Sequence, residues 1–330
     1  MAQVTPWLTN NWQHLVALHG SERLPHALLM HGVAGIGKED FARAFAQYLL
    51  CDQKQGDQAC GQCKSCLLSK AHTHPDLFVL QPEGKSTAIK VDQIRALGEF
   101  IYSSAQQGGY RVVVITPADT MNISAANALL KMLEEPGKDT LLILLTDRMG
   151  QLMPTIKSRC QHLECALPTP EQSSAWLAAQ GVEGEQAQLL LKVCHGAPLA
   201  ALAYHQNNQG QQREALLTGL ADIIKGRRSP LALAEAWQKQ DLEALLGWFY
   251  AVVLDIAKVR QGMLDEPSLS DCANMVKAIA RKAEPKALFA LSDHLLTARQ
   301  SVMLNHNANK QLMLESLLIE WSRVTLSGRR

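Results

Sequence analysis

The chain carries little net charge and no long hydrophobic run. Its 330 residues include 32 Lys and Arg against 31 Asp and Glu, so the formal net charge is +1. This balance gives no bulk attraction to nucleic acid or to a membrane, and any such contact needs a local patch or a partner. The longest apolar run, Leu141–Thr146, has only the length of a strand, and residues 1–7 lack the charged start and apolar core of a signal peptide. We therefore expect a cytoplasmic protein without membrane contact.

Disulfide bonds are not expected, although the chain has eight cysteines. In a cytosolic chain of this length a cysteine cluster indicates a metal site. One cluster has the spacing C-x8-C-x2-C-x2-C and consists of Cys51, Cys60, Cys63 and Cys66. Four converging thiolates form a closed tetrahedral Zn²⁺ site, which is structural rather than catalytic. An iron–sulfur cluster or free thiols are the alternatives, but the bacterial iron–sulfur run continues with C-x3-C-P, where this chain has Lys70 and Ala71.

Residues 32–39 have the G-x-x-x-x-G-K spacing of a phosphate-binding loop. In such a loop backbone N–H groups surround phosphate, the lysine reaches the outer phosphates, and a following Ser or Thr hydroxyl holds Mg²⁺. An apolar run precedes the loop and a helical pattern follows it, so a phosphate would meet a helix N-terminus. Glu39 occupies the place of the hydroxyl. The candidate nucleotide-binding residues are Gly32, Gly35, Gly37 and Lys38. Whether ATP or ADP binds them stays open, since a glycine-rich turn without nucleotide is the alternative.

Strands alternate with helices in the first half of the chain and are absent from the pattern of the second half. Apolar strands are expected at 27–30, 76–80, 111–115, 141–146 and 161–165. The intervening helices include 91–103 and 124–135, and the second of these is expected to be capped by Ser124 and stopped by Pro136. Such alternation predicts a doubly wound α/β domain that ends near residue 168. From Thr169 onward the pattern is helical, with a polar stretch at 206–212 that is typical of a linker.

The acidic residues of an ATPase are missing from the strand that should carry them. In P-loop enzymes an Asp at the tip of a neighbouring strand helps to hold the metal, and in ring ATPases a Glu beside it activates water. The strand at 111–115 ends in Thr116 and Pro117, and Asp119 lies three residues further on. Together with Glu39, these substitutions predict that the chain does not hydrolyse ATP by itself.

An arginine that could act on a neighbouring molecule lies between the strands expected at 141–146 and 161–165. Ser158-Arg159-Cys160 comes after a short helical stretch at 152–157. An arginine at the edge of such a domain can complete a neighbour's site in trans, because its planar guanidinium stabilises charge on a transferring phosphoryl group. An ordinary surface ion pair is the alternative.

Five stretches in this order resemble the clamp-loader subunits of bacterial DNA polymerase III, AAA+ proteins that load the sliding clamp on primed DNA. They are residues 23–29, the phosphate loop, the four-cysteine insertion, residues 124–136 and residues 158–160. The resemblance extends over the whole chain. It implies an AAA+ RecA-like P-loop domain at 1–168 with an inserted zinc module at 51–66, a small helical lid domain at 169–208, and a helical collar domain for oligomerisation at 209–330.

The resemblance also implies a function without autonomous catalysis. Motor subunits of this family keep Thr after the loop lysine, the paired acids, and an Arg in a G-x-x-R lid motif that reads Gly196-Ala197-Pro198-Leu199 here. The chain would thus be a non-motor subunit whose Arg159, with Ser158, serves as an arginine finger for the adjacent ATPase subunit. Its partners would be the ATPase subunits (tau or gamma) and the delta subunit in a five-membered ring, which brings it to the sliding clamp and primed DNA.

Two other functions compete with this interpretation. An active P-loop ATPase, a motor subunit of the same kind of ring, is favoured by the intact residues Gly32–Lys38. A zinc-containing DNA-binding protein is favoured by Lys64 and Lys70 beside the cysteines, although two lysines make a weak electrostatic footprint. His72 and His74 follow the cluster closely, but four cysteines already complete a zinc shell, so we expect these histidines to be loop or core residues.

Overall fold

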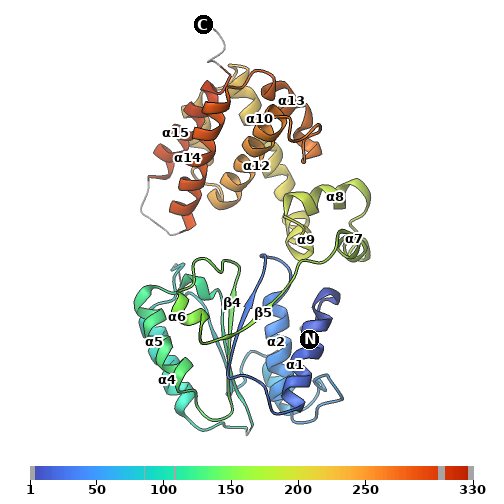
Figure 1. Ribbon diagram of the computed structural model, residues 1–330, viewed down its shortest axis with the longest axis vertical. Coiled ribbons are helices and arrows are strands. Elements are labelled where there is room, and N and C mark those ends of the chain that lie inside the picture. Colours follow the sequence, from blue (N-terminus) through green and yellow to red (C-terminus); the bar gives the residue numbers. More distant parts are fainter. Residues whose placement is uncertain (1–3, 85, 108, 304–308, 326–330) are drawn as a thin grey trace. The chain divides into compact units, whose positions relative to one another are not determined.

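The structure is a computed structural model that describes residues 4–84, 86–107, 109–303 and 309–325 (Figure 1). Its described residues divide into two compact units. The first unit contains the chain up to Ser173 together with the short segment Ala197–Ala200, and the second contains Ser174–Gly196 and the described residues from Ala201 onward. Within the described ranges, no helix combines the length and apolar character that a membrane crossing requires.

A five-stranded parallel sheet forms the centre of the first unit. The strands are β1 (Ala27–His31), β2 (Leu77–Leu80), β3 (Arg111–Ile115), β4 (Thr140–Thr146) and β5 (Gln161–Glu164). Their spatial order is β2-β3-β4-β1-β5, and every neighbouring pair is parallel. All residues of β3 and β4 are buried, as continuous apolar runs in the middle of a parallel sheet should be. The predicted α/β fold of this half is confirmed.

Helices cover both faces of the sheet, so alternate strand residues enter two different cores (Figure 1). Leu28 and Met30 pack with the helices α1 and α2, whereas Ala27 and Leu29 pack with α4, α5 and α6. The helical elements of this unit are η1 (Pro6–Leu8), α1 (Thr9–Gly20), α2 (Lys38–Leu50), α3 (Lys64–Lys70), α4 (Val91–Tyr102), η2 (Ala118–Thr120), α5 (Ile123–Glu134) and α6 (Pro154–Lys157). This period-2 alternation in strands is what gives each face its own apolar layer.

The helix α5 begins earlier than its sequence suggests. The side chain of Asn122 accepts a hydrogen bond of 2.8 Å from the N–H of Ala125, so Asn122 is the N-cap and the expectation of a Ser124 cap is wrong. Asn and Ser serve equally well in this place, and the turn after η2 puts Asn122 there first. The helix ends at Glu134, as the proline at 136 predicts.

The described residues of the second unit form helices and turns without a strand. The helices are α7 (Pro170–Ala179, which starts in the first unit), α8 (Gly184–Val193), α9 (Pro198–Gln206), α10 (Gln209–Ile224), α11 (Pro230–Trp237), α12 (Leu242–Arg260), η3 (Ser270–Cys272), α13 (Ala273–Ala280), α14 (Pro285–Met303) and α15 (Lys310–Arg323). The predicted linker at 206–212 is wrong, because α9 ends at Gln206 and α10 starts at Gln209. Asn208 adopts a φ of 52°, which asparagine tolerates, and the turn needs no longer loop.

A buried ion pair lies inside the helical unit. Arg213 on α10 is 3% exposed, and its guanidinium donates to both oxygens of Asp271, from Nε at 2.6 Å and from Nη2 at 3.1 Å. Its third nitrogen, Nη1, is buried without a hydrogen-bond partner among the described residues. The Arg213 charge therefore depends on one carboxylate for its compensation.

We predict that Asp271→Ala destabilises the protein by about 3–5 kcal/mol, because it leaves a buried guanidinium without its counter-charge. Urea unfolding followed by circular dichroism measures this change. Asp265→Ala is the matched control, since Asp265 is exposed and we expect a change within about 0.5 kcal/mol. Equal stability losses in the two variants would contradict the prediction.

Candidate functional site

The glycine-rich loop between β1 and α2 borders a cavity of about 510 Å³ at the carboxyl ends of the strands. Gly35 and Gly37 have φ angles of 77° and 91°, which only glycine adopts freely, and they turn the chain sharply into the N-terminus of α2. A Cβ on Gly35 would lie 2.4 Å from the Cβ of Ala200. The carbonyl of Gly35 accepts hydrogen bonds from the N–H groups of Leu199 and Ala200, which fasten the loop to the start of α9.

The lysine of the loop is already engaged by the chain itself. Lys38 is 6% exposed, and its Nζ donates to the carbonyl oxygens of Gly32 at 2.9 Å and Val33 at 2.7 Å. The same Nζ forms an ion pair of 2.5 Å with Oδ1 of Asp147, the residue that follows β4. An ammonium group has three N–H donors, so these three acceptors use all of them. No donor of Lys38 is left for a phosphate while this arrangement persists.

The remaining charges of the cavity are acidic. Among the described residues of its lining, Glu39, Asp40 and Asp147 are acidic and Lys38 is the only cation. Glu39 accepts hydrogen bonds from Arg43 at 2.8 Å and from Gln81 at 3.3 Å, which hold its carboxylate in place. Three carboxylates disfavour a triphosphate, and Glu39, rather than a residue with a hydroxyl, follows the loop lysine.

The displaced acid Asp119 fixes the turn that carries Asp147. Its Oδ1 accepts a hydrogen bond of 2.7 Å from the hydroxyl of Thr146, and its Oδ2 lies 3.9 Å from Nε of Arg148. The Thr146 hydroxyl in turn accepts from the backbone N–H of Arg148 at 2.9 Å. Asp119 therefore orders residues 146–148 and does not face the cavity, whose lining at the end of β3 is Thr116 and Pro117.

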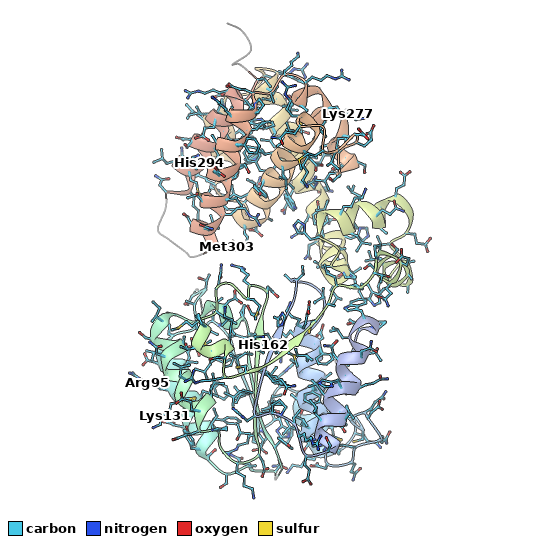
Figure 2. The ribbon with its side chains drawn as sticks, in the orientation of Figure 1. Arg95, Lys131, His162, Lys277, His294 and Met303 are labelled. Atoms are coloured by element: carbon cyan, nitrogen blue, oxygen red, sulfur yellow. The ribbon has the colours of Figure 1, made fainter. Side chains whose placement is uncertain are left out.

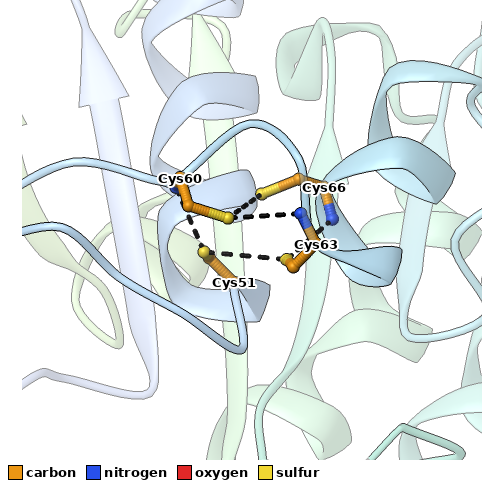
Figure 3. A group of neighbouring side chains, drawn as sticks. All are labelled: Cys51, Cys60, Cys63 and Cys66. Atoms are coloured by element: carbon orange, nitrogen blue, oxygen red, sulfur yellow. Dashed lines mark hydrogen bonds between the residues drawn. The ribbon is translucent and has the colours of Figure 1, made fainter.

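The four clustered cysteines converge, as Figure 3 shows. Their sulfur atoms all lie within 4.8 Å of one another, with 3.9 Å between Cys51 and Cys63 and 4.0 Å between Cys60 and Cys66. A tetrahedral site with Zn–S distances of about 2.3 Å places its sulfurs about 3.8 Å apart. The spacing of the four sulfurs is therefore compatible with a metal ion such as zinc.

The chain around the cluster is folded to support negative sulfur atoms. Cys51 ends α2 and Cys63 caps α3, while backbone N–H groups of Cys60, Cys63 and Cys66 donate to the sulfurs of Cys51, Cys60 and Cys63 at 3.3–3.4 Å. Hydrogen bonds from the N–H groups of Gln62 and Cys63 lower the pKa of Cys60 to about 7. Burial raises the pKa of Cys66 to about 12. A divalent cation would supply the charge that makes all four groups thiolates.

The two histidines after the cluster are not part of it. His74 is buried, and its Nδ1 accepts a hydrogen bond of 3.0 Å from the N–H of Asp76. Burial lowers the pKa of His74, so the ring is neutral near pH 7. Among the described residues, the metal-ligand group contains only the four cysteines. The expectation that His72 and His74 are not ligands agrees with this geometry.

Arg159 lies outside the cavity, just after α6, and its side chain is 35% exposed. Its Nε and Nη2 donate to Oε1 of Glu134, the last residue of α5, at 2.8 Å and 2.5 Å. Its Nη1 donates to the carbonyl of Thr155 at 3.0 Å. The hydroxyl of Ser158 donates to the same carbonyl at 3.2 Å, so Ser158 contributes to the turn rather than to an open site.

The predicted site residues thus fall into three separate places of the first unit: the loop, the cysteine cluster and the Arg159 turn. The sequence analysis missed two side chains, Asp147 and Glu134. Asp147 could have been suspected as the first residue beyond a buried strand, because such residues meet at the carboxyl edge of a parallel sheet. Nothing in the sequence pairs Glu134 with an arginine 25 positions away.

Comparison with known proteins gives a consistent answer along the chain. Residues 7–168 match the family described as DNA polymerase III, delta subunit, and residues 207–323 match the family described as DNA polymerase III, delta subunit, C terminal. The chain is 39% identical to the DNA polymerase III subunit delta′ of Pseudomonas aeruginosa, over 99% of this chain and 100% of that protein. It is 34% identical to the subunits delta′ of Yersinia pestis (98% and 96% covered) and Escherichia coli K12 (95% and 94% covered).

We predict that Cys63→Ser lowers the bound zinc of the purified chain from one equivalent to less than about 0.2 per chain, because three thiolates make an incomplete shell. Metal analysis after dialysis measures the content. Cys194→Ser, outside the cluster, should keep its zinc. Retention of a full equivalent in Cys63→Ser would contradict a four-cysteine site.

We also predict that the unmodified chain binds ATP-Mg²⁺ too weakly to detect by calorimetry, and that Asp147→Asn binds it at least tenfold more tightly. The variant returns one charge-assisted hydrogen bond of Lys38 to a phosphate, worth about 1.5–3 kcal/mol. Asp40→Asn removes the same charge from the lining without touching Lys38, so a similar gain there would show a general charge effect instead. The double variant Lys38→Ala/Asp147→Asn should lose the gain.

Proposed function

The chain belongs to the family of DNA polymerase III delta′ subunits, and from this membership we propose that it is a non-motor clamp-loader subunit that lends Arg159 to a neighbouring ATPase subunit. In this proposal the chain itself does not hydrolyse ATP. It supports the loading of the sliding clamp on primed DNA as one member of a five-membered ring with the ATPase subunits (tau or gamma) and the delta subunit. One observation carries the proposal. All three N–H donors of the loop lysine Lys38 are engaged by groups of the same chain, whereas the side chain of Arg159 is partly exposed at the surface.

The loop geometry supports the absence of a motor function. Lys38 gives its three N–H donors to Gly32, Val33 and Asp147, and Thr116 and Pro117 stand where a metal-holding and a water-activating acid would act. The competing hypothesis of an active ATPase needs a free lysine, a metal ligand and a base at once. In the cavity the lysine is engaged by Asp147, and Thr116 and Pro117 take the places of the two acids at the end of β3, which supports the non-motor interpretation.

Arg159 supports the role in trans. Its side chain is 35% exposed and lies just after α6, next to the end of α5, so a neighbouring subunit could reach it without unfolding the chain. The helices α4 and α5 next to it form the outer layer of the first unit, where Figure 2 labels Arg95 and Lys131. An arginine in this setting can stabilise charge on a phosphoryl group that a neighbour transfers.

We assign the cysteine cluster to structural zinc. A closed shell of four sulfurs leaves no open position for substrate, and it ties the end of α2 to the start of α3. The competing hypothesis of a zinc-dependent DNA-binding protein rests on Lys64 and Lys70. These residues lie six positions apart on α3, which at 3.6 residues per turn directs them to different sides of the helix. They form no common basic face.

We extend the proposal to the helical part of the chain, with a lid at 169–208 and a collar at 209–330. Its support is that α7–α9 share a small apolar cluster around Leu177 and Tyr204, whereas α10–α15 share a larger one around Phe249 and Trp321. In the larger cluster the ring of Trp321 is fully buried and its Nε1 donates to the carbonyl of Leu220 at 2.9 Å. A rigid helical body of this kind suits a subunit that assembles with others.

We predict that Arg159→Ala lowers the ATP turnover of the reconstituted ring at least tenfold, because a neighbouring site then lacks the charge that stabilises its transition state. The measurement is steady-state ATP hydrolysis with sliding clamp and primed DNA, at matched ring concentration. Size-exclusion chromatography should show that the variant ring still assembles.

Arg95→Ala serves as the matched control for this experiment. Arg95 is an exposed arginine on α4 whose only ion pair with a described residue is with Asp92 on the same helix, at 2.9 Å. Its removal takes the same charge from the same layer of the unit, and turnover should stay unchanged. Full turnover in the Arg159→Ala ring would refute the arginine-finger role.

A further inference from the structure

The proposed arginine finger does not stand free in this structure but is held by a carboxylate of its own chain. Oε1 of Glu134 accepts from Nε of Arg159 at 2.8 Å and from Nη2 at 2.5 Å, and the carbonyl of Thr155 accepts from Nη1 at 3.0 Å. Glu134 is 52% exposed and Arg159 is 35% exposed, so solvent and a partner molecule can reach the pair. The contact joins α5 to the end of α6.

Part of the Arg159 guanidinium has no hydrogen-bond acceptor among the described residues. An arginine has five N–H donors, of which Glu134 occupies two and Thr155 one. The two that remain belong one to Nη1 and one to Nη2. A pair of N–H groups on the terminal nitrogens is the end of the guanidinium that can contact two phosphate oxygens together. Glu134 therefore holds Arg159 by its side and leaves its tip available.

The backbone of the residue that holds Arg159 is anchored. Glu134 is the last residue of α5, a helix that buries Leu129, Met132 and Leu133 against the sheet. The ring of His26, just before β1, makes a hydrogen bond of 2.9 Å through Nε2 with the carbonyl of Leu133. This hydrogen bond anchors the C-terminal turn of α5 to the residue before the first strand, so the backbone of Glu134 is held in place.

We propose that Glu134 is a positioning residue for Arg159, which fixes the side of the guanidinium so that its two free N–H groups face the ATP site of a neighbouring subunit. The proposal rests on the function proposed above. A long arginine side chain samples many rotamers, and a bond made in advance removes most of that freedom before the partner arrives. Catalysis by an oriented charge loses strength when the orientation is lost.

The opposite role predicts the opposite result. If Glu134 sequestered Arg159 away from the partner, its removal would release the arginine and raise turnover. If the pair were only a surface ion pair, its removal would change nothing, since exposed pairs contribute little. The direction of the change in kcat therefore separates positioning from both alternatives.

The test compares reconstituted rings that contain the wild-type chain, Glu134→Ala, Glu134→Gln or Glu135→Ala. Steady-state ATP hydrolysis with sliding clamp and primed DNA gives kcat and KM for each ring. We expect Glu134→Ala to lower kcat about three- to tenfold with KM unchanged, because substrate binds in the partner's own site. Glu134→Gln keeps an acceptor oxygen for Arg159 and should recover part of the loss. It also keeps the test valid if the alanine variant assembles poorly.

Glu135→Ala is the control for charge and helix-end effects. Glu135 is the next residue, is exposed, and its carboxylate makes no hydrogen bond or ion pair among the described residues, while only its backbone carbonyl accepts from Tyr102. This ring should turn over ATP like the wild type. A loss in Glu135→Ala equal to that in Glu134→Ala would overturn the proposal.

The double variant Glu134→Ala/Arg159→Ala supplies the readout that a merely structural role would not produce. If Glu134 acts through Arg159, its removal has no further effect once Arg159 is gone, so the double variant should match Arg159→Ala within error. An additional independent loss would overturn the proposal. Unchanged kcat in Glu134→Ala beside a large loss in Arg159→Ala would overturn this inference alone. Unchanged kcat in Arg159→Ala would instead remove the proposed function on which it rests.

Discussion

The pairing of β1 with β4 decides what the phosphate loop can do. The register places His31 beside Thr146, so the residue after each strand meets the other at the carboxyl edge of the sheet. The residue after β1 is Gly32, which begins the glycine-rich loop, and the residue after β4 is Asp147. Once the strands pair, the Asp147 carboxylate lies 2.5 Å from the Lys38 ammonium. The acids that an ATPase would carry at the end of β3 are missing, and the acid after β4 neutralises the loop lysine instead.

A second consequence of the same sheet is the position of Arg159. The chain leaves β4, forms the short helix α6 and returns as β5 on the far side of β1, so Arg159 emerges beside the end of α5. There the guanidinium contacts Glu134, and two of its N–H groups have no acceptor among the described residues. The engagement of Lys38 and the partly exposed position of Arg159 therefore both depend on the same arrangement of strands. This combination is consistent with the proposed subunit that assists a neighbour and does not act alone.

The cysteine cluster stabilises the segment between α2 and β2. The segment between α2 and β2 is long and has no apolar core of its own beyond the cysteines and Ala59. Four sulfurs around one metal ion would give that segment a fixed shape at the cost of few residues, because each ligand restricts the backbone on both sides.

Local patterns in the sequence were enough for the α/β half, the helical half, the glycine-rich loop and the four-cysteine group, since each depends on residue type and spacing over a short range. The same patterns placed the helix cap at Ser124 and a linker at 206–212, where competing local signals from Asn122 and Asn208 prevailed. Only the tertiary structure determines which carboxylates Lys38 and Arg159 pair with. Their partners Asp147 and Glu134 lie 109 and 25 positions away in the chain, and only strand order and helix packing bring charges at such separations into contact.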